Sequence, residues 1–272
     1  MSNAVLRIIT AVVGAPLLLG MAYLGGWYFG VLVLVIGVLS QIELYDLMEQ
    51  GGVRAWKVAG IVIGALLALR AFLPLVVQGA VVVALAVLAW SAFSDKNRPL
   101  DALGGTLFGA IYPTALLAFL TDLRLARGVS VGDMDAFYLT LSVFLLIWAT
   151  DTLAYYTGKS IGKTPLAPSI SPKKTWEGAI GGGIGAVLAA VLLKLTLLGF
   201  LAWPHVIVMA LICGVVSQVG DLMESRIKRS VGAKDSGTLL PGHGGMLDRF
   251  DAMILAAPLV FLYLRYGARM FE

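Results

Sequence analysis

The sequence is poor in charged residues, cysteine and histidine, and each shortage excludes a class of protein. Charged residues make up 13% of the 272 positions, against roughly 25% in a soluble domain, too few to cover a water-soluble surface. The one cysteine, Cys213, excludes a disulfide within the chain. The two histidines, His205 and His243, lie far apart in the sequence and do not form the pattern of a zinc site.

Long apolar runs dominate the rest of the chain, which is 59% hydrophobic with a mean hydropathy of +0.91. A bilayer core needs about 20 apolar residues per helix, which predicts an all-α polytopic membrane protein of about nine transmembrane helices. The expected spans are 4–24, 27–47, 56–72, 73–93, 102–121, 137–156, 176–201, 203–220 and 250–266. Only Arg70 and Pro74 separate the third span from the fourth, so eight spans is the alternative.

Basic residues are distributed unequally between the two ends of these spans. With nine spans, 14 of the 20 lysines and arginines fall on the side that holds the N-terminus. The positive-inside rule makes this side cytoplasmic and is sufficient to explain the net charge of +4. The alternative is an anionic substrate or lipid headgroup. We expect one membrane domain over 1–272, with N-terminal helices in 1–136 and the chemistry in 137–272.

The two longest cytoplasmic loops, 158–175 and 221–249, follow the sixth and eighth spans and are the most polar. We expect them to form the polar site. Ionisable residues at membrane depth are functional candidates. For Glu43 and Asp46, at the end of the second span, we favour simple solvation at the water boundary.

Acidic and basic residues alternate where the eighth span ends. If that helix continues, Asp221, Glu224, Ser225 and Lys228 share one face. The carboxylates suit a metal ion and the ammonium group suits a phosphate oxygen. The alternative is a helix face with internal ion pairs.

A glycine-rich stretch follows, with glycines at 242, 244 and 245 that let backbone N–H groups approach an anion. It is not a Walker A motif, because no Gly-Lys-Ser/Thr has the required spacing. Asp248 and Asp251 are three residues apart at the expected start of the ninth helix, where capping alone explains one of them.

The loop after the sixth span predicts an anion site at a helix N-terminus. Ser171 followed by Pro172 has the pattern of an N-cap with proline in the first helical position. Lys173 and Lys174 would then oppose the helix dipole in the first turn, which a bound anion would explain. The alternative is ordinary cytoplasmic flanking charge.

Carboxylates and lysines beside an anion-binding loop indicate metal-assisted phosphoryl or nucleotidyl transfer. A transporter with Asp151 and Asp221 on an ion path is a rival, but the paired broken helices typical of transporters do not occur in the sequence.

Two segments resemble phosphatidate cytidylyltransferases. The order Ser225, Lys228-Arg229, Lys234-Asp235, Pro241-Gly242-His243-Gly244-Gly245, Asp248-Arg249 and Asp251 is similar to the signature of that family. The stretch 151–178, with Ser171-Pro172-Lys173-Lys174-Thr175-Trp176-Glu177-Gly178, is also similar. The first 140 residues resemble the family only as a succession of apolar helices.

The resemblance implies that CTP and phosphatidic acid react to give CDP-diacylglycerol and pyrophosphate. It also implies magnesium, a second cation beside it, a bacterial inner membrane with the site facing the cytoplasm, and a homodimer; we expect no nucleic-acid partner. A different lipid acceptor, polyprenyl or ether lipid, and a lipid kinase are the rivals. The predicted catalytic residues are Asp221, Asp248 and Lys228, and the predicted magnesium ligands are Asp221, Glu224, Asp248 and Asp251. The predicted substrate-binding residues are Ser171, Lys173, Lys174, Thr175, Ser225, Arg229, Lys234, Asp235, His243 and Arg249.

Overall fold

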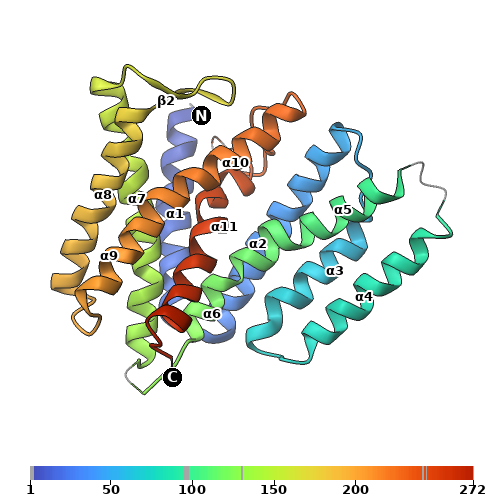
Figure 1. Cartoon of the computed structure of the whole chain (residues 1–272), viewed down its shortest axis with the longest axis horizontal. Coiled ribbons are helices and arrows are strands. Elements are labelled where there is room, and N and C mark those ends of the chain that lie inside the picture. Colours follow the sequence, from blue (N-terminus) through green and yellow to red (C-terminus); the bar gives the residue numbers. More distant parts are fainter. Residues whose placement is uncertain (1–2, 95–97, 130, 241, 243, 272) are drawn as a thin grey trace. The chain divides into compact units, whose positions relative to one another are not determined.

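Helices make up most of the computed structural model, which describes residues 3–94, 98–129, 131–240, 242 and 244–271 (Figure 1). The α-helices are α1 (Asn3–Leu24), α2 (Gly26–Gln50), α3 (Lys57–Ala68), α4 (Val76–Ser91), α5 (Pro99–Gly109), α6 (Phe119–Leu125), α7 (Asp133–Ile161), α8 (Trp176–Thr196), α9 (Trp203–Leu211), α10 (Ser217–Ser230) and α11 (Leu247–Leu262). Shorter helical turns are η1 (Leu69–Ala71), η2 (Ala110–Ala115), η3 (Ile212–Val216) and η4 (Tyr263–Gly267). Within the described residues, β1 (Pro165–Ala167) and β2 (Ser171–Thr175) are the only strands and form an antiparallel hairpin.

Five helical stretches in the described part of the chain are long and apolar enough to cross a membrane: Gly26–Gln50, Pro99–Leu125, Asp133–Ile161, Trp176–Thr196 and Trp203–Ser230. Val12–Leu24 and Val76–Ser91 are apolar but shorter. The protein is therefore a multi-pass helical membrane protein, as predicted, and the count of nine spans stays a prediction.

The third and fourth expected spans are two separate short helices. α3 ends at η1, and α4 begins at Val76, so the chain breaks where Arg70 and Pro74 predict it. The Arg70 guanidinium donates to the Leu67 carbonyl at this break and to the Ala115 carbonyl of η2, at 3.0 Å each. With 12 residues, α3 is about 18 Å long, shorter than a bilayer core of about 30 Å.

The chain divides into two compact units, which we call the first and second unit. The first comprises Met1–Thr121 and Ile227–Phe250, and the second Asp122–Arg226 and Asp251–Glu272. In the first unit α2 packs against α3 and α5. A buried polar chain joins these helices: Gln41 Nε2 donates to the Tyr45 hydroxyl at 2.9 Å, which donates to the Thr106 carbonyl at 2.8 Å.

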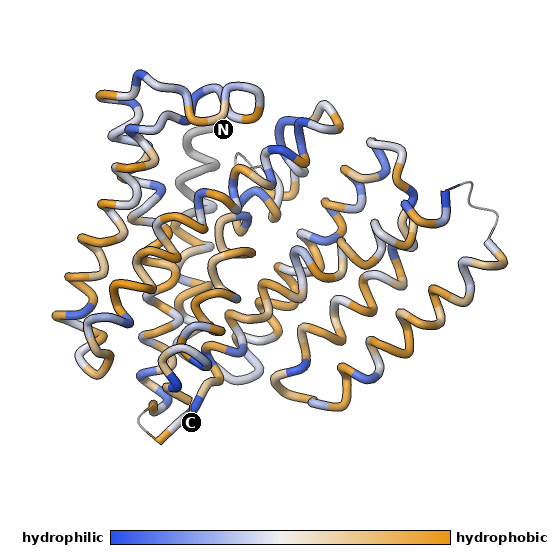
Figure 2. The backbone as a smooth tube through the Cα atoms, viewed as in Figure 1, coloured by the Kyte–Doolittle hydropathy of each residue, from blue (hydrophilic) through white to orange (hydrophobic). Residues whose placement is uncertain are grey.

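In the second unit α7 and α8 lie side by side at short range. A Cβ on Gly182 would lie 3.0 Å from the Thr150 carbonyl, and one on Gly185 would lie 3.0 Å from the Ala149 carbonyl. The glycine run at the start of α8 therefore permits close helix packing. Figure 2 shows hydrophobic residues along α8 and α9 and hydrophilic residues around the β1–β2 hairpin.

Candidate active site

α10 continues to Ser230, so the condition under which Asp221, Glu224, Ser225 and Lys228 share one helix face is met. Its N-terminal part, with Asp221, Glu224 and Ser225, belongs to the second unit, and its last turn, with Lys228, belongs to the first. The predicted site residues are therefore described unit by unit.

In the first unit Asp248 lies in the first turn of α11, and its carboxylate is surrounded by donors. Lys228 Nζ contacts Asp248 Oδ1 at 2.6 Å, and the side chains of the pair are only 9% and 5% exposed. Asp248 Oδ2 accepts the backbone N–H groups of Ser236 at 2.9 Å and Gly245 at 2.8 Å. The sequence therefore predicts a helical acid here correctly but does not reveal its buried partner, Lys228.

Asp248 and Lys228 enclose a turn that requires glycine. Gly242 and Gly244 have φ angles of 76° and 85°, in the left-handed region that side chains disfavour. The Leu240 N–H donates to the Gly244 carbonyl at 2.9 Å and closes the turn. Pro241 and His243, which flank Gly242, lie outside the described residues.

The remaining predicted residues of the first unit are exposed at its surface: Arg229, Lys234, Asp235 and Arg249. The Arg229 guanidinium donates to the Ala233 carbonyl at 2.6 Å and so joins the last turn of α10 to the chain that follows it. Lys234 and Asp235 directly precede Ser236, so they lie at the start of the glycine-rich turn. Their exposure leaves room for contact with a soluble substrate.

Glu43 is a residue of this unit that our sequence analysis assigned to simple solvation, and that assignment is wrong. Its side chain is buried in α2, and its carboxylate accepts three hydrogen bonds: from the Ser236 hydroxyl, the Met246 N–H and the Leu247 N–H, each at 2.9 Å. The signal was present in the sequence, because an ionisable residue at the end of an apolar span is a functional candidate. Asp46, by contrast, is exposed and pairs with Lys57.

In the second unit Asp221 lies beside one of the predicted lysines. Lys174 Nζ contacts Asp221 Oδ2 at 2.5 Å, and the two side chains are 29% and 34% exposed. The Ser225 hydroxyl donates to Asp221 Oδ1 at 3.3 Å, one helical turn further on. The loop after the sixth span and α10 therefore meet through Lys174 and Asp221, as a shared polar site requires.

Glu224 and Asp251 have different surroundings. Glu224 is fully buried on α10. Asp251 Oδ1 accepts the N–H of Ala252 at 2.7 Å, and the Asp251 carbonyl lies close to α10, where a Cβ on Gly220 would approach it to 2.7 Å. The Asp251 backbone therefore leaves no room for a side chain at Gly220.

The expected helix start at Ser171 is wrong. Ser171–Thr175 forms strand β2, paired with β1, and α8 begins at Trp176 with Thr175 as its N-cap. The Thr175 hydroxyl accepts the Gly178 N–H at 3.1 Å. Lys173 and Lys174 consequently lie in a strand rather than in the first helical turn, and the argument from opposed dipoles no longer applies to them. Hairpin pairing wins here because Pro165 and Ala167 offer a partner strand that the helix pattern of Ser171-Pro172 does not reveal.

The carboxylates fit magnesium in their donor chemistry. Among the residues that the structure describes, no three Asp, Glu, His or Cys side chains gather closely enough to enclose a metal ion. Mg²⁺ is usually held by one or two carboxylates, substrate phosphates and water. Asp221 is part-exposed on α10 and can take such a role, whereas Glu224, one turn further on, is buried.

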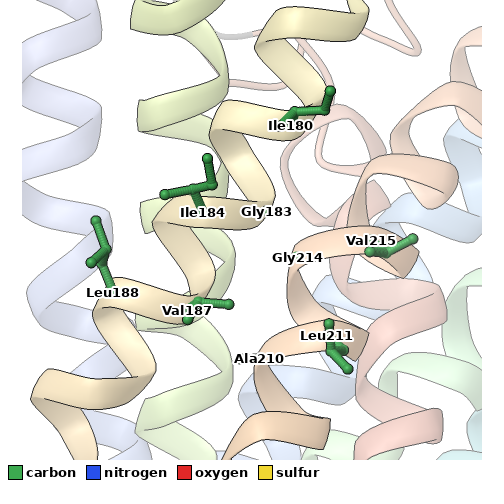
Figure 3. Close-up of a pocket in the computed structure, with 9 residues that line it drawn as sticks. All are labelled: Ile180, Gly183, Ile184, Val187, Leu188, Ala210, Leu211, Gly214 and Val215. Atoms are coloured by element: carbon green, nitrogen blue, oxygen red, sulfur yellow. The ribbon is translucent and has the colours of Figure 1, made fainter.

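A cavity of about 350 Å³ between α8 and α9 is a different kind of site (Figure 3). Its lining is apolar, as Ile184, Val187 and Leu211 illustrate. It offers no charged side chain to a phosphate, so the candidate active site is the polar set described above.

The fold and these polar residues define a class: a multi-pass membrane protein with a lysine–carboxylate pair in each unit and a glycine-rich turn in the first. The cytidylyltransferase family model matches residues 5–267, nearly the whole chain. A phosphatidate cytidylyltransferase of Brucella abortus is 37% identical over 265 residues, covering 97% of this chain and 94% of the relative. Proteins of the same name from Synechocystis and Bacillus subtilis are 33% and 31% identical, each with at least 95% coverage of both chains. The chain belongs to the cytidylyltransferase family.

Proposed function

We propose that this protein is a phosphatidate cytidylyltransferase, which transfers CMP from CTP to phosphatidic acid and produces CDP-diacylglycerol for phospholipid synthesis. The observation that carries the proposal is similarity to proteins of that name along nearly their whole length. The membrane spans give access to a lipid substrate, and the lysines and glycine-rich turn suit a polyanionic nucleotide.

The reaction needs charge neutralisation more than proton transfer. An oxygen of the phosphatidate phosphate attacks the α-phosphorus of CTP, the bond from that phosphorus to the β-bridging oxygen breaks, and pyrophosphate leaves. Phosphatidate is already ionised near neutral pH, so no strong general base is required. The protein contributes positioning and stabilisation of the developing charge.

Lys174 and Lys228 supply positive charge for this purpose. Each is paired with a carboxylate, Lys174 with Asp221 and Lys228 with Asp248. The phosphates of the substrates would compete with Asp221 for the part-exposed Lys174 ammonium group, whereas Lys228 is nearly buried and stays paired with Asp248. Lys173, Lys234, Arg229 and Arg249 are exposed and are the remaining cations that we assign to the substrates.

Magnesium is the proposed cofactor, with a second cation beside it. Asp221 and Glu224 would hold the ion, and Asp248 and Asp251 are the further proposed ligands. When bound, the ion would neutralise phosphate charge and stabilise the pyrophosphate leaving group.

Orientation and assembly complete the proposal. We propose nine spans with the site on the cytoplasmic side of a bacterial inner membrane, because 14 of the 20 basic residues fall on that side. The homodimer implied by the family resemblance is tested by the mass of the detergent-solubilised protein in light scattering.

The activity is tested with purified protein in detergent, phosphatidic acid, Mg²⁺ and CTP labelled on either the α- or the γ-phosphate. A cytidylyltransferase moves the α-label into lipid and releases the γ-label as pyrophosphate. γ-Label in the lipid would identify a lipid kinase instead. Polyprenyl phosphate and an ether-linked phosphatidate, supplied in parallel, distinguish the lipid acceptors; absence of label in every lipid would refute the proposal.

A further inference from the structure

Glu43 has a set of contacts that the proposed chemistry does not use. It lies in α2, in the N-terminal part of the chain, 193 residues before Ser236 and 204 before Leu247 in sequence. Its side chain is buried, with only 8% of the residue exposed. Buried carboxylates are strongly unfavourable unless hydrogen bonds satisfy them. Glu43 meets that condition through three donors, all from residues 236–247, which end at the first residue of α11.

Two of these donors belong to the start of α11. Met246 N–H donates to Glu43 Oε1 and Leu247 N–H donates to Glu43 Oε2, both at 2.9 Å. The first N–H groups of a helix have no partner within the helix, and the positive end of the helix dipole lies there. Glu43 therefore caps α11 from another helix and fixes the position of the turn that carries Asp248.

The third donor ties the opposite end of the same segment. The Ser236 hydroxyl donates to Glu43 Oε2 at 2.9 Å, while the Ser236 N–H donates to Asp248 Oδ2 at 2.9 Å. Two carboxylates, Glu43 and Asp248, thus hold both ends of residues 236–247. Gly237 and Gly245 allow this approach, because a Cβ on either would lie 2.7 Å or 2.4 Å from a Glu43 carboxylate oxygen.

We propose that Glu43 is a positioning residue for the nucleotide: by tying residues 236–247 at both ends, it holds the glycine-rich turn in the shape that receives CTP phosphates. The proposal rests on the proposed function for its ligand. It also gives the N-terminal helices a role beyond membrane anchoring, since Glu43 belongs to α2. Glu43 acts through the segment and needs no contact with substrate.

The test compares Glu43→Gln with Asp46→Asn, which removes a charge one turn further along α2 from an exposed side chain outside the tie. Gln cannot accept all three hydrogen bonds, because one carboxylate oxygen becomes an N–H₂ donor facing a backbone N–H. We expect Glu43→Gln to raise the KM for CTP about tenfold, or roughly 1.4 kcal/mol, with the KM for phosphatidate unchanged. Asp46→Asn should leave both constants unchanged.

A second readout does not depend on activity. Leu239→Cys, at an exposed position in the segment, is introduced into a Cys213→Ala background, and the rate of thiol labelling reports how well the segment is held. We expect Glu43→Gln to raise that rate at least about threefold while Asp46→Asn does not. If wild-type protein fails to use CTP, the proposed function is wrong. The labelling rates would still show whether the hydrogen bonds of Glu43 hold residues 236–247 in place.

Unchanged labelling in Glu43→Gln would overturn the proposal, and so would faster labelling with an unchanged KM for CTP. If Glu43→Gln does not fold, Ser236→Ala removes one donor only and is expected to show the same two effects at smaller size. In the double variant of Glu43→Gln and Ser236→Ala the effects should be less than additive, because both changes release the same segment. Additive effects would show that Glu43 and Ser236 do not act through the same segment.

Discussion

The two lysine–carboxylate pairs, one in each unit, differ in exposure. Lys174 and Asp221 are about one-third exposed, so water screens their attraction. Either side chain can therefore leave its partner and bind another ligand. Lys228 and Asp248 are nearly buried, so the loss of one partner leaves the other charge without compensation. Equivalent substitutions in the two pairs should therefore have different consequences.

Asp221→Asn should abolish most activity without unfolding the protein. The side chain keeps its shape and half of its acceptor capacity but loses the charge proposed to hold magnesium. We expect turnover to fall at least about a hundredfold, since tenfold corresponds to about 1.4 kcal/mol, and the melting temperature to stay near that of wild type. CDP-diacylglycerol formation across a magnesium titration measures this, with Asp46→Asn as the matched control. Near-normal turnover would remove Asp221 from the metal site.

Asp248→Asn should instead destabilise the fold, by about 3–5 kcal/mol, because Lys228 would remain buried without its counter-charge. Combining it with Lys228→Met should recover much of that stability without restoring activity. Unfolding in detergent measures both, against Asp46→Asn, whose exposed pair is worth at most about 1 kcal/mol. If the Asp248→Asn protein were as stable as the Asp46→Asn protein, the Lys228–Asp248 pair would not contribute to stability as predicted. Activity loss in Asp248→Asn alone therefore cannot identify a metal ligand.

At the scale of elements, α8 shows how a helix boundary and a helix interface are set. Thr175 caps the helix through the Gly178 N–H, while Ser171, the residue that matches the N-cap pattern, lies in a strand. The interface with α7 depends on small residues. Gly185 faces α7, whereas a Cβ on Gly183 would have no heavy atom within 4 Å.

Alanine at these two glycines should have opposite effects on stability. Gly183→Ala should stabilise the protein by up to about 1 kcal/mol, because alanine favours the helix. Gly185→Ala should destabilise it by about 1–3 kcal/mol, because the added methyl group would lie 2.9 Å from Leu153 Cβ. Thermal unfolding in the same detergent compares the pair, and effects of the same sign would show that the interface does not limit residue size.

At the scale of the whole molecule, the distribution of basic residues predicts which segments face the cytoplasm. Cysteine introduced at Lys173 or Lys234, in a Cys213→Ala background, should react with a membrane-impermeant thiol reagent only after the cells are opened. Cysteine at Val129, which is 95% exposed in the connection before α7, should react in intact cells. Labelling of position 234 in intact cells would overturn the cytoplasmic site. With nine spans, the same distribution predicts that Glu272 lies on the opposite side of the membrane; this residue is outside those that the structure describes.

The sequence by itself determined the features that depend on neighbouring residues. Apolar runs of membrane length gave the class and order of the helices, and the break at Arg70 and Pro74 lies where proline predicts it. The glycines at 242 and 244 have the left-handed backbone that their turn was expected to require. The spacing of Asp221 and Ser225 predicted that they share one face of a helix. In the structure the Ser225 hydroxyl donates a hydrogen bond to Asp221.

Only the tertiary structure decided which charged groups meet. Nothing in the sequence near Glu43 reveals that its three donors follow about 200 residues later, because a side chain's partner across the fold leaves no local pattern. The same reason applies to Lys228 and Asp248, which helix spacing could not pair across the connection between α10 and α11. Ser171-Pro172 was misread because pairing with β1, a contact between separated residues, outweighs a local capping preference.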